Sequence, residues 1–359
     1  MKITDKYLLG RFLKILFLAL IAFILVVIIV DVVENVDKFI DHDVPLQVVI
    51  LYYVYYVPFI IMLALPVAVL LSIMFTVGSL AKYHELEVMK ANGISLYRLS
   101  LPLLAAGFLI SVAAIFFTDF VMVPAGQLKD ELKTQEIDKT GSRDGIFRQN
   151  VIKAARGGWV VFAQSYNELE RTGNSVIIDR IENNQITVAI KAKKMIWADS
   201  GWVLIELTRR DFHDGDQVRF AAYDTLFAGF LPHTPEIMSR RLKKPRDTRF
   251  FDLMKVVSLK QWMGQDTARD KVELYLKISF PFINFIIVIL GVPLAANPRR
   301  SGGSVGFGLS IIISFIYFVI LRAGQSFGYN HKIPPLLAAT AGNVIFLLIG
   351  SIMFVKARK

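Results

Sequence analysis

The sequence predicts an α-helical membrane protein with six transmembrane helices plus an exported all-β, jellyroll-like domain. Three observations predict this class. The 359-residue chain is 54% hydrophobic, which is more apolar than an ordinary soluble protein. It contains six apolar runs of about 20 residues or more, the length that crosses a bilayer. Between the third and fourth runs lies a long polar block in which apolar and polar residues alternate, as in β-strands.

The six apolar runs are taken in chain order as membrane spans. They cover residues 12–33, 52–80, 97–122, 272–296, 304–325 and 334–355. The first run is not expected to be a cleaved signal peptide, because Asp31 and Glu34 stand where small residues of a cleavage site belong. The predicted domains are therefore spans one to three within 1–122, the polar block at 123–269, and spans four to six within 270–359.

Basic residues predict the orientation of these spans. Lys and Arg gather at one set of span ends, which includes both termini and Lys82, Lys90 and Arg98. Because positive residues remain on the cytoplasmic side, both termini are expected in the cytoplasm and the polar block outside. The net charge of +11 is then mostly a topology signal, and we expect no nucleic-acid partner.

The polar block predicts six antiparallel strands within residues 146–231. They are Ile146–Ala155, Trp159–Tyr166, Ser175–Ile181, Ile186–Ala198, Trp202–Leu207 and Val218–Phe230, which together favour a sandwich or jelly roll. A helical link at Gly126–Lys139, a basic strap at Pro232–Arg249 and a short helix at Phe251–Gly264 connect the strands to the spans. The chain has no cysteine, so this domain is held without disulfides. Its apolar face either fills a core or lines a slot for an acyl chain.

No catalytic or metal-binding pattern is found. The chain lacks a G-x-x-x-x-G-K-[ST] loop, so it is not expected to be an enzyme that hydrolyses ATP. The glycine-rich run Ser301–Gly308 opens a span, and we interpret it as a flexible turn. The five histidines show no metal-ligand spacing. We therefore expect no catalytic residues, no metal and no cofactor bound by this chain.

The segment between spans two and three predicts a short cytoplasmic helix at about 83–92, ending at Gly93 as a C′ cap. Leu86, Met89 and Val88 form an apolar stripe on it, beside glutamates that include Glu85. Such a helix lies either on lipid headgroups or in a groove of a partner protein. Glutamates facing an anionic leaflet favour the partner.

Motifs across the chain resemble one known family. They are Glu85-x-x-x-Met89-x-Ala91-x-Gly93, Leu65-Pro66 within the second span, Asp41-x-Asp43-Val44-Pro45 before it, Pro293-Leu294-x-x-Asn297-Pro298-Arg299 after the fourth span, and Ile333-Pro334-Pro335 before the sixth. Together, in this order, they resemble the LptF/LptG permeases of lipopolysaccharide export. The Asp41 motif is closer to LptF and the Ile333 motif to LptG, so the subunit type stays open.

The resemblance implies a multi-pass permease subunit of the cell inner membrane with a periplasmic jellyroll. Its implied partners are a second LptF/LptG-type subunit, a periplasmic jellyroll bridge protein, lipopolysaccharide, and a cytoplasmic ABC ATPase dimer that holds ATP and Mg. It implies ATPase coupling for Glu85, Met89, Ala91 and Gly93, and we add Leu86 from the apolar stripe. Alternatives are an ABC permease for lipoprotein release or mechanotransmission, and an ATP-independent transporter or sensor.

Basic residues at the outer span ends are the predicted headgroup contacts, because positive-inside insertion does not explain them. They are Lys38, Arg269, Lys271, Lys277 and Arg322. Their side chains would meet lipid phosphates by charge-assisted bonds, or else snorkel to ordinary phospholipid. Acidic residues between Asp31 and Asp43 surround Lys38 in the sequence. An alternative is therefore that divalent cations bridge these carboxylates to the lipid phosphates.

Overall fold

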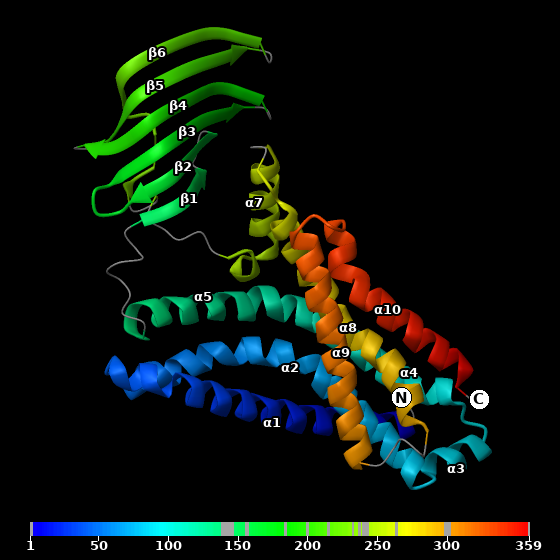
Figure 1. Ribbon diagram of the computed structural model, residues 1–359. Helices are drawn as coiled ribbons and strands as arrows, with labels where there is room; N and C mark the ends of the chain where they lie inside the picture. The colour runs from blue at the N-terminus through cyan, green and yellow to red at the C-terminus, as the bar shows by residue number, and fades with distance from the viewer. Residues whose placement is uncertain are drawn as a thin grey trace. The chain divides into compact units, whose positions relative to one another are not determined.

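The computed structural model describes residues 3–137, 147–154, 158–182, 185–198, 201–213, 216–231, 233–235, 238, 244–262, 265–297 and 303–357. The chain forms two compact units. The first comprises Met1–Lys133 and Lys244–Lys359 and is helical, and the second is Thr134–Lys243 and contains a β-sheet (Figure 1). The outer part of the Pro293–Arg299 motif, Pro298 and Arg299, lies outside the described residues.

The prediction of six spans is confirmed. The helices are α1 (Ile3–Asp41), α2 (Leu46–Lys82), α3 (Glu85–Ala91), α4 (Leu96–Phe117), α5 (Val123–Leu132), α7 (Phe250–Trp262), α8 (Ala268–Ala295), α9 (Gly303–Tyr329) and α10 (Pro335–Lys356), with π-helical turns η1 (Thr118–Met122) and η2 (Lys133–Ile137). Among the described residues, six helical stretches are long and apolar enough to cross a membrane. They are α1, α2, α4 with η1 and α5, α8, α9 and α10.

Helices α2 and α8 form the centre of the helical unit. In their most apolar stretches 78% and 67% of the residues are buried, against 11% in α1 and 28% in α9. Small residues let the central helices approach closely: Gly107 of α4 lies against Val288 of α8, and Gly291 of α8 lies against Ile73 of α2. Helices α1 and α9 therefore present most of their apolar surface to the outside of the unit.

The second unit confirms the predicted antiparallel all-β domain. Its strands are β1 (Phe147–Ala154), β2 (Trp159–Asn167), β3 (Thr172–Glu182), β4 (Gln185–Ala198), β5 (Gly201–His213) and β6 (Asp216–Ala228). They pair in the order β1-β2-β3-β4-β5-β6, so the described strands form one curved sheet (Figure 1). This meander differs from a sandwich of two sheets, because each strand pairs with its neighbour in sequence.

A row of kinks crosses the sheet. Ser175 of β3 and Glu206 of β5 have φ angles of +49° and +48°, which non-glycine residues rarely adopt. On β5, Leu204 and Leu207 are both buried although they are three residues apart, so the in-out alternation changes phase at Glu206. The pairing register of β4 and β5 is nevertheless the same on both sides of the row, as the pairs Lys194↔Ile205 and Ala192↔Leu207 show. It is kept because the in-out alternation of both strands changes at the same place.

One face of the sheet carries the core of the second unit. The buried side chains include Tyr166, Met195 and Trp202. The segment after β6 crosses this face, where the Trp202 indole Nε1 donates to the His233 carbonyl oxygen at 2.6 Å. Burial lowers the pKa of His233, whose ring Nε2 lies 3.2 Å from the Lys153 carbonyl oxygen. The chain's own segment after β6 thus covers the part of this face around Trp202.

Candidate functional site

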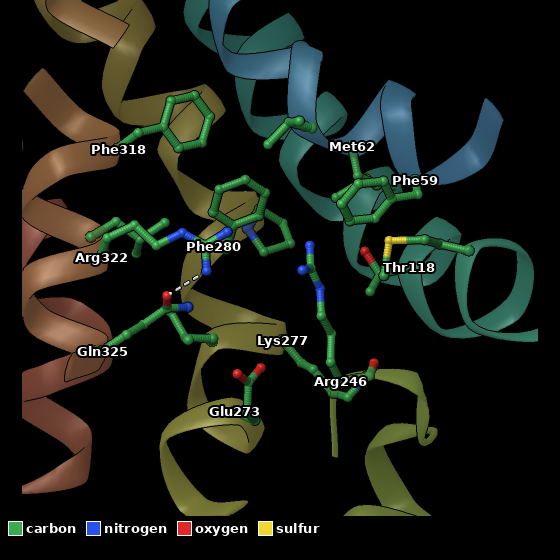
Figure 2. A pocket seen from close by; sticks show the side chains of 15 residues that line it. Phe59, Met62, Thr118, Arg246, Glu273, Lys277, Phe280, Phe318, Arg322 and Gln325 are labelled. Atoms are coloured by element: carbon green, nitrogen blue, oxygen red, sulfur yellow. Dashed lines mark hydrogen bonds between the residues drawn. The ribbon is translucent and has the colours of Figure 1, made fainter. Parts of the chain in front are cut away.

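A pocket of about 100 Å³ opens within the helical unit, among α2, η1, α8, α9 and the short 3₁₀ turn η3 (Pro245–Asp247) (Figure 2). Its apolar lining is Phe59, Met62, Leu63, Met122, Leu276, Phe280, Pro281, Phe318 and Leu321. Its polar lining is Thr118, Arg246, Glu273, Lys277, Arg322 and Gln325. The walls are therefore those of an apolar site in which a few charged groups converge.

Three cations from three separate segments meet in this pocket. Lys277 of α8 is only 9% exposed, and its Nζ donates to the Arg246 carbonyl oxygen at 3.4 Å and lies 4.0 Å from Asp119 Oδ1. The Arg246 guanidinium lies 4.5 Å from the ring centre of Phe59. Figure 2 shows the guanidinium groups of Arg246 and Arg322 directed toward the middle of the pocket from opposite sides.

The lining residues leave the pocket positively charged. Three cations and one carboxylate, Glu273, give a net charge of +2 (3 − 1). Glu273 already accepts a hydrogen bond from the Tyr329 hydroxyl, and Asp119 lies beside Lys277 without lining the pocket. With Asp119 counted beside Glu273, the three cations still leave a net charge of +1 (3 − 2), so an anion in this pocket would be favourably placed.

Turn η3 is held by the helices on both sides of it. The Gln127 side chain of α5 donates from Nε2 to the Asp247 carbonyl oxygen at 2.7 Å, and the Phe250 amide donates to Asp119 Oδ1 at 2.7 Å. Burial raises the pKa of the Asp247 carboxyl, and the nearby Asp130 raises it further. These contacts fix Arg246 in the pocket although it belongs to a connecting segment.

The structure brings together two of the five predicted headgroup residues, Lys277 and Arg322. Arg269 lies outside the pocket, with its guanidinium 5.4 Å from the Tyr329 ring centre, and Lys271 is half-buried elsewhere on α8. Lys38 is exposed on α1, where its Nζ donates to Asn35 at 3.3 Å.

Arg246 is the pocket cation that sequence reasoning missed. It belongs to the basic strap predicted at Pro232–Arg249, but the strap contains several Lys and Arg residues and no pattern separates this one. Its neighbour Pro245 begins the 3₁₀ turn, which only the packed helices place against the pocket.

One acidic residue in the C-terminal part of α1 contacts the neighbouring helix α2. Asp31 Oδ2 accepts a hydrogen bond from the Tyr53 hydroxyl of α2 at 2.9 Å. In the part of the chain that the structure describes, no group of three or more His, Cys, Asp or Glu residues is placed to hold a metal ion.

The short helix α3 forms where it is predicted, with two turns rather than three. Gly93 has a φ of +79°, and its amide donates to the Lys90 carbonyl oxygen at 2.9 Å. The Ile94 amide reaches back to Met89 at 3.0 Å, which completes a Schellman cap. The predicted C′ role of Gly93 is therefore confirmed.

The two faces of α3 have different surroundings. Leu86 is 3% exposed and belongs to the core of the helical unit, and Met89 packs against that core. On the opposite face Val88 is 61% exposed, and Ala91 is exposed with it. Glu85 is half-buried. Two residues of the predicted apolar stripe, Leu86 and Met89, thus pack inward, whereas the third, Val88, lies at the centre of the available surface of α3.

One edge of the sheet is the long strand β6. Among the described strands it pairs with β5 alone and ends the strand order. Several large apolar side chains on it are exposed, namely Val218, Phe220, Tyr223 and Phe227. A long, exposed, apolar edge strand is a natural place for another strand to add.

Comparison with known proteins agrees with these features. Residues 6–356 match the family model described as "Lipopolysaccharide export system permease LptF/LptG". The chain is 22% identical over 369 residues to the lipopolysaccharide export system permease protein LptF of Escherichia coli (strain K12), covering 98% of this chain and 94% of that protein. It is equally similar to LptF of Shigella flexneri. It is 20% identical over 300 residues to LptG of Escherichia coli (strain K12), covering 79% of each.

Proposed function

The chain belongs to the LptF/LptG family of lipopolysaccharide export permeases, and on that premise we propose that it is one membrane subunit of an ABC-type lipopolysaccharide extractor. In this proposal it takes the lipid from the outer leaflet of the inner membrane and passes it toward a periplasmic bridge. The observation that carries the proposal is the convergence of Arg246, Lys277 and Arg322 on an apolar pocket. This combination suits an amphiphile with phosphate groups.

The orientation follows from the distribution of basic residues. Both termini and α3 lie in the cytoplasm in this proposal, because Lys and Arg gather at those ends of the spans. The pocket then lies toward the periplasmic ends of α2, α8 and α9, and the sheet is periplasmic. Turn η3, which places Arg246, is the return connection from the sheet to α7 and α8.

In the pocket, each group has a distinct role. Lys277 and the two guanidinium groups bind phosphate oxygens of the headgroup, and the guanidinium planes favour two-pronged contact. Phe59, Phe280 and the other apolar walls contact the first part of the acyl chains. Lys38, Arg269 and Lys271 stay proposed as outer contacts that meet the headgroup before it enters.

Energy comes from a separate cytoplasmic ATPase dimer, which holds ATP and Mg. Helix α3 docks in a groove of that ATPase, with Val88 and Ala91 at the contact and Glu85 facing a basic residue. Gly93 ends the helix so that this face projects. Leu86 and Met89 act from the other face, because they join α3 to the helical unit and transmit its movement.

Two further partners fit exposed surfaces. A second LptF/LptG-type permease covers the apolar faces of α1 and α9, which are the least buried spans of the unit. A periplasmic jellyroll protein adds a strand at the edge formed by β6, where exposed Val218 and Phe220 supply apolar contacts. The lipid is moved because it binds the open arrangement of these parts better than the closed one.

The proposal is tested by site-specific photocrosslinking. A photoreactive residue replaces Phe318 in the pocket, and Leu347 on α10, which does not line the pocket, serves as the matched control. Lipopolysaccharide should crosslink from position 318, and ATP added with the ATPase should reduce the yield. Absence of crosslinking at 318, or equal yields at both positions, contradicts the assignment of this pocket.

ATPase docking is tested by co-purification. The substitution Glu85→Arg should abolish recovery of the ATPase with the permease. The control is Glu87→Arg, at an exposed position two residues further along, which should reduce recovery less. Full recovery with Glu85→Arg contradicts docking through α3.

A further inference from the structure

A second cavity lies between α1 and α4 and shares no lining residue with the pocket described above. Its volume is about 790 Å³, within the range of about 300–1,000 Å³ typical of small-molecule sites. Its walls are apolar: Leu9, Leu13, Leu101, Pro102, Ala105, Ala106, Leu109 and Ile110. Asp5 and Arg98 line its N-terminal end. We call it the α1–α4 groove.

The dimensions of the groove identify what fits in it. From Arg98 to Ile110, α4 advances twelve residues, or about 18 Å at about 1.5 Å per residue. One leaflet of a hydrocarbon core of about 30 Å is about 15 Å thick, so the groove spans one leaflet. Dividing the volume by this length gives a mean cross-section of about 44 Å².

A transmembrane helix does not match these dimensions. With side chains a helix is about 10–12 Å wide, a cross-section of about 80–110 Å², and it must cross both leaflets. The groove has about half this cross-section and spans one leaflet, which is half of the required length. A flexible hydrocarbon chain has no such minimum width, and an apolar groove open to the bilayer is filled by such chains.

The charged end of the groove indicates a headgroup. Arg98 Nη1 and Nη2 each donate to one carboxylate oxygen of Asp5 at 3.0 Å. The guanidinium has five N–H donors, and this pair uses two. The Asp5 side chain is 12% exposed and the Arg98 side chain 39%, so the arginine is the partner that faces outward. Lys6, Arg11 and Lys14 add positive charge to the same turns of α1.

We propose that the α1–α4 groove binds a resident anionic phospholipid, with its phosphate at Arg98 and an acyl chain along Leu101, Ala105 and Leu109. Under the proposed orientation this lipid belongs to the cytoplasmic leaflet, opposite the leaflet that supplies the transported lipid. It is therefore not cargo. Its acyl chain fills the space between α1 and α4. This contact stabilises α1, a helix that packs mainly against α2 and has few buried residues of its own.

The proposal is tested by native mass spectrometry of the full-length chain, loaded with dioleoylphosphatidylglycerol and washed in detergent. The wild type should retain one lipid. Ala105 lines the groove and is exposed, so the indole of Ala105→Trp fits without disturbing the core and occupies the space of the acyl chain. Retention of the lipid should fall at least tenfold. Leu348→Trp, at an exposed position of α10 outside the groove, is the matched control and should retain the lipid.

The headgroup contact is tested by the double substitution Asp5→Asn with Arg98→Gln, which keeps a neutral hydrogen-bonding pair and leaves no buried charge unpaired. It should lower retention of phosphatidylglycerol about tenfold with little change in retention of the uncharged dioleoylglycerol. Equal retention by Ala105→Trp and wild type overturns the groove assignment, and an unchanged double variant overturns the phosphate contact. Neither readout involves lipopolysaccharide or the ATPase, so failure here is distinguishable from failure of the transport proposal.

Discussion

The buried cation of the pocket gives the sharpest prediction, tested by Lys277→Met. The substitution keeps the length and apolar stem of the side chain and removes its charge. At the observed 4.0 Å from Asp119, the ion pair is worth about 4 kcal/mol at an effective dielectric constant of about 20. Burying the ammonium costs several kcal/mol in the opposite direction. We therefore expect the free energy of unfolding to change by about 1 kcal/mol or less.

Loss of binding should be much larger than loss of stability. A charge-assisted hydrogen bond to phosphate contributes about 1.5–3 kcal/mol, so affinity for lipopolysaccharide should fall about 10- to 150-fold. Binding of labelled lipopolysaccharide is measured in nanodiscs, and thermal unfolding is measured on the same samples. Lys255→Met, at an exposed position of α7 outside the pocket, is the control and should change affinity less than threefold.

The opposite pattern would refute this reasoning. Suppose that Lys277→Met lowers the free energy of unfolding by about 3 kcal/mol or more while the folded fraction binds lipid normally. The lysine then stabilises η3 through the Arg246 carbonyl and Asp119. It would then have no role in the headgroup contact.

Four further predictions follow from other parts of the chain. Gly93→Val forces a β-branched residue into a φ of +79°, and should destabilise the end of α3 by about 1–2 kcal/mol and reduce ATPase recovery in pull-downs. Val88→Arg should abolish that recovery without changing the melting temperature, because the side chain is exposed. Burial raises the pKa of Asp179 to about 6, so its contribution to stability is complete below about pH 4 and is lost as pH rises through 6. The protection of β3 amides against hydrogen exchange, relative to the intrinsic exchange rate at each pH, should therefore fall between about pH 4 and 6.5, and Asp179→Asn should remove that fall. Phe220→Lys at the sheet edge should weaken binding of a soluble jellyroll partner in pull-downs and leave the circular dichroism spectrum unchanged.

Hydropathy predicts the spans well because each one must satisfy its own backbone hydrogen bonds within the bilayer. The predicted ends were less accurate. The first span was predicted at 12–33, whereas α1 covers Ile3–Asp41, since a helix continues through charged residues once its backbone is hydrogen-bonded. Apolar composition predicts which part of a helix lies in the hydrocarbon core, and it does not predict how far the helix continues beyond that core.

The strands show a different reason for error. The fifth strand was predicted to end at Leu207, but β5 continues to His213. The third was predicted to begin at Ser175, but β3 begins at Thr172. Both errors fall at the row of kinks, where Ser175 and Glu206 reverse the in-out alternation. A method that follows period-two alternation ends a strand at such a point, although the backbone pairing continues across it.

The candidate site was only partly predictable. Lys277 and Arg322 stood out because charges within or beside a span need a partner or water. Arg246 did not, since nothing local to a basic strap places one of its side chains against α2 and α8. On α3, Leu86 and Met89 of the predicted stripe share one face, but Val88 is on the opposite one, and sequence cannot tell which face meets the chain's own core and which meets a partner. Leu86 packs against the chain's own core.

Helix α2 connects the two ends of the proposed mechanism. It provides the pocket residues Phe59 and Met62 and ends at Lys82, just before α3, about 35 Å away along one helix. Pro58 and Pro66 both lie inside α2 and remove the backbone donors that would bond the Val54 and Met62 carbonyls, so the helix is most easily bent beside the pocket wall. Because Leu86 and Met89 bury α3 against the same core, a force on its exposed face moves the helical unit with it. We therefore propose that such movement changes the shape of the pocket by bending α2 at these prolines.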